Sequence, residues 1–167
     1  MIYYNPIQVD PIDKPVEYAP RTCFIMTQLG EPVPQVITEI RNHLSQKLQE
    51  LRIKEVDAST LVTGRDFLLK IWHQLISVPL GIGIIDETMS AQTMSNIFYE
   101  VGVLQAYGKE SIIIKTKKAK IPSDFIRTEY IPFDNHFGNR LDKYFETFFA
   151  LEDYFLNMAD QLEKNPL

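Results

Sequence analysis

Residues 81–115 read GIGIIDETMSAQTMSNIFYEVGVLQAYGKESIIIK, and this stretch decides the fold. It begins within the apolar run 80–86 and ends with the run 111–115, and both have the length and pattern of strands covered on two faces. Between them, residues 95–108 have helical spacing, with Ser95 as a suitable N-cap and a glycine at the end. A strand, a helix and a second buried strand predict a right-handed crossover between parallel strands.

The same alternation of strands and helices continues along most of the chain. Further strands are expected at 22–27, 53–57 and 129–134, the last at a sheet edge because it contains a proline. Further helices are expected from Pro34 to about Leu51, from Arg65 or Asp66 to the residue before Pro79, and over 138–164. We therefore predict an α/β fold of the flavodoxin-like class: a three-layer α/β/α sandwich with a mostly parallel sheet of about five strands and a long C-terminal helix.

The chain is predicted to have three parts. Prolines at 6, 11, 15 and 20 make residues 1–21 an extended arm, because proline breaks helices and removes strand donors. Residues 22–134 hold the alternating strands and helices and form the α/β domain. Residues 135–167 form a helical extension whose aromatic residues occupy more than one stripe. We expect this extension to pack on the domain or on a partner.

The composition limits the class of protein. With 167 residues, 45% hydrophobic and 23% charged, the chain is of ordinary globular type. A net charge of -5 argues against a nucleic-acid platform, and the basic sequence KTKKAK at 115–120 fits a solvated loop. The single cysteine, Cys23, lies in an apolar run and indicates a small buried side chain in a reducing compartment. The start of the chain has no leader pattern and no apolar run is long enough to span a membrane, so we expect a cytoplasmic protein.

Common cofactor and catalytic motifs are missing from the sequence. It contains neither a GxxxxGK[ST] loop nor a GxGxxG sequence between a strand and a helix, and it contains no GxSxG elbow. The three histidines, His43, His73 and His136, lie far apart without metal-ligand spacing. We therefore expect no metal and no bound cofactor.

Parallel sheets bind ligands outside the carboxyl ends of their strands, at the point where the strand order reverses. The loops that this rule selects follow Thr27, Asp57, Asp86 and Lys115. Asp86 has two interpretations that the residues leave open. It binds a sugar hydroxyl, or it caps the loop after its strand.

Glu100 is a lone acid inside the apolar sequence NIFYEVG, residues 96–102. On a helix it lies about 40° from Leu104, at the border of the buried face. A carboxylate at such a border loses hydration, which raises its pKa toward the range used for proton transfer or nucleophilic work. The alternative is a helix-favouring glutamate near the positive end of the helix macrodipole.

The elements around Glu100 resemble a known group of proteins. IIDET, NIFYEVG, QAYGKE and SIIIK, with GRDFLLKIWHQLI (64–76) before them and IPSDFIRTEYIPFD (121–134) after them, are similar to the TIR-like and nucleoside 2-deoxyribosyltransferase-like group of flavodoxin-like proteins. The resemblance covers about residues 22–134. In active members, the glutamate of the Tyr-Glu pair acts at the anomeric carbon of a nucleoside or of NAD, and Glu100 takes that position here.

The resemblance implies roles for six residues. Glu100 would be the catalytic carboxylate that stabilises or captures an oxocarbenium-like centre. Asp86 would bind the ribose hydroxyls. The substrate-binding residues implied are Thr27, Gln28, Asp86, Asn96 and Tyr99.

We accordingly expect a TIR-like nucleotide N-glycosidase that cleaves NAD or a related nucleotide, as an effector that works once assembled. The first-strand loop TQLGEPVP lacks the aromatic residue of typical deoxyribosyltransferases, so we rank hydrolysis above transfer. The alternatives are a non-catalytic nucleotide-sensing or assembly module and a nucleoside 2-deoxyribosyltransferase. The expected partners are a nucleotide or nucleoside and further copies of the chain, and we expect neither a membrane nor nucleic acid as a partner.

Overall fold

The computed structural model describes residues 16–60, 67–125 and 128–164. Five parallel strands form one sheet in the order β2-β1-β3-β4-β5. The strands are β1 (Thr22–Met26), β2 (Lys54–Asp57), β3 (Leu80–Ile85), β4 (Glu110–Lys115) and β5 (Glu129–Pro132). The helices are α1 (Gln35–Glu50), α2 (Phe67–Ser77), α3 (Ala91–Ala106) and α4 (Phe137–Lys164), with short 3-10 turns η1 (Ala58–Thr60) and η2 (Ser123–Phe125).

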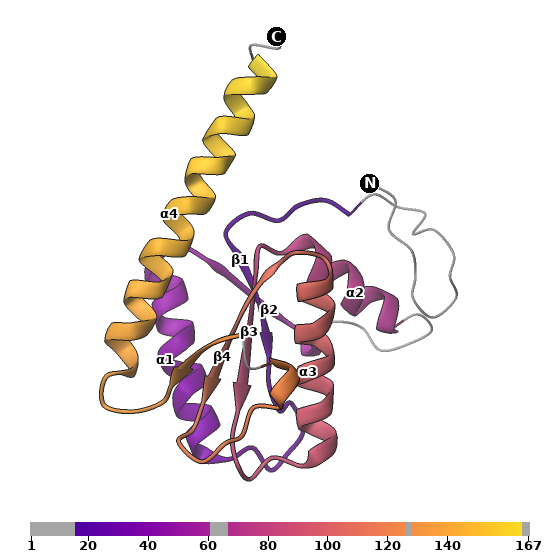
Figure 1. Cartoon of the computed structure of the whole chain (residues 1–167), viewed down its shortest axis with the longest axis vertical. Helices are drawn as coiled ribbons and strands as arrows, with labels where there is room; N and C mark the ends of the chain where they lie inside the picture. The colour runs from indigo at the N-terminus through magenta and orange to yellow at the C-terminus, as the bar shows by residue number, and fades with distance from the viewer. Residues whose placement is uncertain (1–15, 61–66, 126–127, 165–167) are drawn as a thin grey trace.

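The helices cover the sheet on two sides (Figure 1). α1 and α4 lie on one face, where Lys47 forms an ion pair of 3.0 Å with Asp142. α2 and α3 lie on the other face, where the rings of Trp72 and Tyr107 meet edge-on at 5.5 Å between centroids. The predicted flavodoxin-like three-layer sandwich is therefore confirmed, with β5 at the edge as expected. The strand order reverses between β1 and β3.

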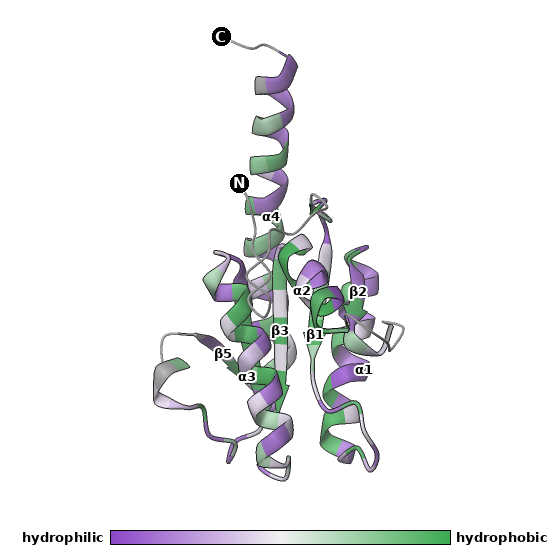
Figure 2. Cartoon of the chain, turned by 90° about the vertical axis from the view of Figure 1, so that its right-hand side faces the viewer, coloured by the Kyte–Doolittle hydropathy of each residue, from purple (hydrophilic) through white to green (hydrophobic). Residues whose placement is uncertain are grey.

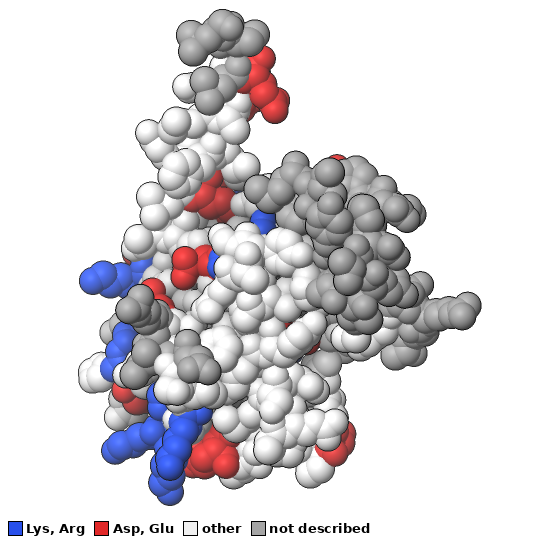
Figure 3. Space-filling view, turned by 45° about the vertical axis from the view of Figure 1, so that its right-hand side comes forward, with Lys and Arg blue, Asp and Glu red and all other residues white. Residues whose placement is uncertain are grey.

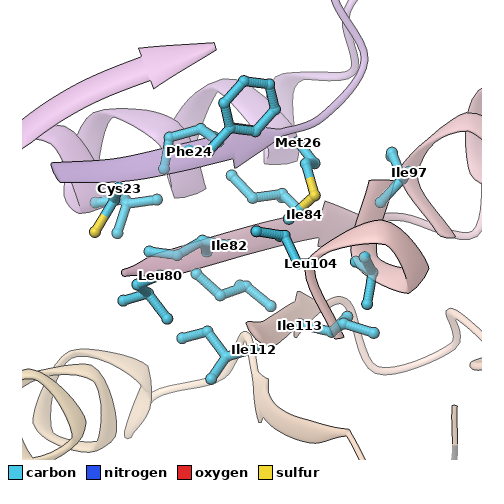
Figure 4. Close-up of a cluster of buried hydrophobic side chains, with 14 of the residues drawn as sticks. Cys23, Phe24, Met26, Leu80, Ile82, Ile84, Ile97, Leu104, Ile112 and Ile113 are labelled. Atoms are coloured by element: carbon cyan, nitrogen blue, oxygen red, sulfur yellow. The ribbon is translucent and has the colours of Figure 1, made fainter. Parts of the chain in front are cut away.

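The centre of the sheet holds α3 close to β3. Every residue of β1 and β3 is buried, as the two continuous apolar runs predict. Figure 4 shows Ile97 and Leu104 of α3 packing against side chains of β3 and Met26. A methyl group added at Gly81 would lie 2.1 Å from Leu104 Cδ1, so a larger residue at this position would force the Leu104 side chain to move. The tight contact fixes α3, and with it Glu100, relative to the carboxyl end of the sheet.

The predicted start of α3 at Ser95 is wrong. The helix begins at Ala91, and the N-cap is Ser90, whose hydroxyl accepts a hydrogen bond of 3.1 Å from the Thr93 amide. A tight turn directly after β3, in which the Met89 amide donates to the Asp86 carbonyl at 3.2 Å, brings the chain into helix one turn earlier. The expected start of α2 at Arg65 or Asp66 lies outside the described residues.

Residues 16–21, the described part of the N-terminal arm, lie on the domain. The Tyr18 hydroxyl donates to Glu152 Oε1 of α4 at 2.7 Å, and the Ala19 amide donates to the Ser77 carbonyl at 2.9 Å. The division into three parts stays a prediction, because residues 1–15 are outside the described residues. Cys23 is buried in β1, as its apolar setting indicates. Among the described helices none has the length and hydrophobicity needed to cross a membrane.

Candidate functional site

A cavity of about 520 Å³ lies at the carboxyl end of β1, beside the reversal in strand order. One wall is the loop 27–31 after β1, with Ala58 after β2 beside it. The other walls are the first turns of α2 and one face of α3. The sheet rule had selected four loops, and those after Thr27 and Asp57 contribute residues to this cavity, whereas the described residues of those after Asp86 and Lys115 do not.

Glu100 lines this cavity from α3. Its side chain is partly buried, and this burial raises the pKa of the carboxyl group to about 7. Within the described residues we find no hydrogen bond or ion pair to the Glu100 carboxylate. Lost hydration alone therefore disfavours ionisation of the Glu100 carboxyl group. A group of this kind changes protonation near neutral pH.

Five of the six residues with implied site roles lie around the same cavity. Besides Glu100 these are Thr27, Gln28, Asn96 and Tyr99. The Thr27 hydroxyl is buried and has no hydrogen-bond partner among the described residues. The Gln28 side-chain amide donates to the carbonyls of Gly30, at 3.0 Å, and Pro32, at 2.7 Å, and thereby shapes the loop wall. The assigned binding roles stay predictions, since shared position does not test them.

Asp86 is the sixth residue, and it is absent from the cavity lining. Its side chain is buried, and its Oδ1 accepts hydrogen bonds from the Thr88 amide, at 2.9 Å, and from the Thr88 hydroxyl. Burial alone would raise the pKa of Asp86, but these hydrogen bonds hold it below its ordinary value. The contacts are those of a turn cap, one of the two interpretations that the sequence left open. Its contact with ribose hydroxyls stays a prediction.

The wall contributed by α2 was not assigned to the site from the sequence. Phe67, Leu68 and Ile71 line the cavity, and Leu68 is 46% exposed. Trp72, one residue further, donates its indole N–H to the Tyr99 hydroxyl at 3.1 Å. This bond connects α2 to α3 directly beside Glu100, so Trp72 holds one wall of the cavity in place.

The cavity lining is weakly charged and acidic. Its charged members among the described residues are Glu31 and Glu100, with no lysine or arginine. On the face shown in Figure 3, lysine and arginine gather mainly at one lower corner, and much of the rest of the described surface is uncharged. Over the described residues no group of three or more His, Cys, Asp or Glu side chains could hold a metal ion.

Comparison of the sequence with protein-family models and with curated proteins gives no match. Solved structures do match the fold. A 2-deoxyribosyltransferase from the psychrotolerant bacterium Bacillus psychrosaccharolyticus matches with a TM-score of 0.57 and 12% identity, over 76% of this chain and 95% of that chain. A CMP N-glycosidase of Clostridium botulinum matches with a TM-score of 0.50 and 15% identity, over 74% of this chain and 98% of that chain.

These two neighbours bear on the resemblance seen in the sequence. At such low identity the likeness shows a shared fold, and it covers most of both neighbours. It agrees with the 2-deoxyribosyltransferase-like part of the resemblance. Neither neighbour is a TIR protein, so the TIR-like part stays an expectation.

Proposed function

We propose that the protein is an N-glycosidase of a nucleoside or nucleotide, with Glu100 as its catalytic carboxylate. The observation that carries this proposal is a half-buried acid with a pKa of about 7 that opens into a cavity at the strand-order reversal. The names of the two structural neighbours support the same class of substrate. NAD, expected from the sequence, is one nucleotide within this class and is a finer proposal.

The chemistry requires one well-placed carboxylate. As the bond between the anomeric carbon and the base nitrogen breaks, the base leaves with the electron pair and takes up a proton from water. Glu100, in its ionised form, stabilises the positive charge at the anomeric carbon or forms a bond to it. A water molecule then attacks that carbon, loses a proton to solvent and displaces the Glu100 carboxylate if a bond had formed, which releases the sugar of a nucleoside or the sugar phosphate of a nucleotide. If a second base attacks in place of water, the reaction becomes a transfer.

The remaining walls of the cavity suit a nucleoside. The buried Thr27 hydroxyl and the Asn96 amide offer polar groups for a sugar or a base edge. Phe67 and Tyr99 offer aromatic rings beside which a base can stack. A mostly apolar pocket with a few polar groups is the usual form of a small-molecule site.

Product analysis tests the proposed function. We expect the purified protein to release free base from at least one of CMP, NAD and the common ribo- and deoxyribonucleosides, each incubated separately and separated by chromatography. A second free base added to the deoxynucleoside reactions distinguishes transfer, which gives an exchanged nucleoside, from hydrolysis, which gives only sugar and base. Binding detected by calorimetry without any release of base would contradict the proposal and favour the nucleotide-sensing alternative.

Trp72→Phe is expected to lower kcat/KM about twofold to tenfold on whichever substrate is cleaved. The change keeps an aromatic ring in the buried position but removes the hydrogen bond to Tyr99 that joins α2 to α3. A hydrogen bond of this kind contributes about 0.5–1.5 kcal/mol net to the stability of the arrangement that it holds. A loss of the same size in transition-state binding lowers kcat/KM by about twofold to tenfold. Steady-state kinetics of Trp72→Phe, Tyr99→Phe and the double variant measure it.

The double variant is the control for this bond. If Trp72 acts through Tyr99, the double variant is no slower than the slower single variant, because both changes remove the same interaction. Two effects that simply add would show that Trp72 does not act through this hydrogen bond.

A further inference from the structure

One apolar stripe runs along the whole of α4. Its residues recur at alternating spacings of four and three, the pattern of coiled-coil positions that face a partner helix. These residues, which we call the α4 stripe, are Phe137, Leu141, Tyr144, Phe148, Leu151, Phe155 and Met158. The spacing is kept without interruption from the first turn of the helix to its last third.

The α4 stripe is covered by the domain at one end and uncovered at the other. Phe137 and Leu141 are buried, and Tyr144 and Phe148 are partly buried against the core. In contrast, Leu151 is 52%, Phe155 62% and Met158 41% exposed. Figure 2 shows apolar residues continuing along α4 beyond the level of the sheet. A contiguous apolar stripe of this kind indicates an interaction surface.

Most charged side chains on the exposed part of α4 point away from the stripe, which allows α4 of a second copy to contact it. On a helix of 3.6 residues per turn, Asp153, Asp160 and Lys164 lie on the side opposite the stripe. Lys164 pairs there with Asp160 at 2.6 Å. Of the positions that flank the exposed stripe, Glu152 is buried against the domain, where it accepts a hydrogen bond from Tyr18, and Tyr154, Ala159 and Gln161 carry no charge. Two identical helices can therefore meet along the stripe without opposing like charges.

The domain supplies a second wall beside the stripe. Two cavities, of about 460 and 500 Å³, lie along the same side of α4 and share Phe148, Leu151 and Glu110 in their linings. One is bordered by β5, and the other by Pro79 and Lys109 at the amino ends of β3 and β4. The two cavities adjoin at these shared residues beside the exposed stripe, and their linings also hold charged side chains of both signs.

We propose that α4 of a second copy of this chain covers the α4 stripe, so that the protein is a homodimer joined through its C-terminal helices. The coiled-coil spacing of the stripe, the uncharged flanking positions beyond Glu152 and the adjoining cavities all fit an identical helix as the occupant. This interface lies at the amino ends of the strands, whereas the Glu100 cavity lies at their carboxyl ends. Dimer formation is therefore independent of the proposed activity.

Light scattering coupled to size-exclusion chromatography tests this interface. We expect the full-length protein to elute as a dimer and Phe155→Glu to weaken self-association at least about thirtyfold, because a charge replaces an apolar side chain at both copies of the contact. The matched control is Asn157→Glu, which adds the same charge on the opposite side of the same exposed turn and is expected to leave the dimer intact. A wild-type protein that is monomeric over a wide range of concentration overturns the proposal, as does equal disruption by both variants.

Further measurements keep the test decisive. Met158→Glu, at a second exposed stripe position, is expected to disrupt the dimer as Phe155→Glu does, and circular dichroism melts confirm that both variants fold. Neither change touches the cavity, so any turnover of the wild type is expected in the variants as well. A monomeric wild type that binds vesicles of phosphatidylcholine and phosphatidylserine through Phe155 would assign the stripe to a lipid surface and overturn the proposal.

Discussion

Glu100→Gln is expected to reduce turnover by about a thousandfold while leaving the fold intact. Glutamine has nearly the same size and keeps helix propensity, but it carries no negative charge and does not form the bond to the anomeric carbon that a carboxylate forms. The loss corresponds to about 4 kcal/mol of transition-state stabilisation, a usual size for removal of one charge aimed at the reacting centre. The measurement is kcat/KM for base release from the substrate that the wild type cleaves.

Glu31→Gln is the matched control for this change. Glu31 lines the same cavity but is exposed, and its carboxylate already accepts a hydrogen bond of 3.1 Å from the Val33 amide. We expect its turnover to stay within a few-fold of the wild type. If Glu100→Gln keeps wild-type turnover, Glu100 has no part in the reaction. In the wild type, turnover that falls below a pH of about 7 would identify the ionised carboxylate as the active form.

Strand positions and fold class could be predicted because they depend on patterns that the chain carries locally. A run such as LGIGII has no polar face, and only a strand covered on both sides accommodates it. The start of α3 could not be predicted in the same way. Ser90 and Ser95 are equally suitable caps by residue type, and the choice between them depends on the tight turn after β3.

Some residues of the candidate site could also be predicted from the sequence, and others could not. Thr27, Glu100 and the residues near them could be placed together because the carboxyl ends of parallel strands share one edge of the sheet. Phe67, Leu68 and Ile71 could not, because apolar residues at helical spacing are typical of a core-facing stripe, and only the tertiary position of α2 turns part of that stripe toward the cavity. For Asp86, the local signal was Thr88, two residues on, which is the spacing of a capped turn.

Glu100→Gln is also expected to stabilise the protein, by about 3 kcal/mol at pH 8. The carboxyl group has a pKa of about 7 in the folded state and an ordinary value of 4.5 when exposed, so between these values the folded state binds the proton more tightly than the unfolded state. The free energy of unfolding of the wild type therefore falls as the pH rises from about 4.5 to about 7, and the loss is complete above that range. Glutamine does not titrate, so the free energy of unfolding of Glu100→Gln does not fall in this way as the pH rises.

Urea unfolding of the wild type and Glu100→Gln at pH 5 and pH 8 measures this difference. The two proteins are expected to be close in stability at pH 5, where Glu100 is protonated in the folded state, and to diverge at pH 8. Glu146→Gln, which changes an exposed glutamate on α4, is the control and is expected to show the same small difference at both values. A gap between Glu100→Gln and the wild type that is independent of pH would mean that Glu100 does not titrate in this range. A gap that opens with pH would mean that the chain retains an acid that destabilises it, which is expected of a residue kept for chemistry and not for folding.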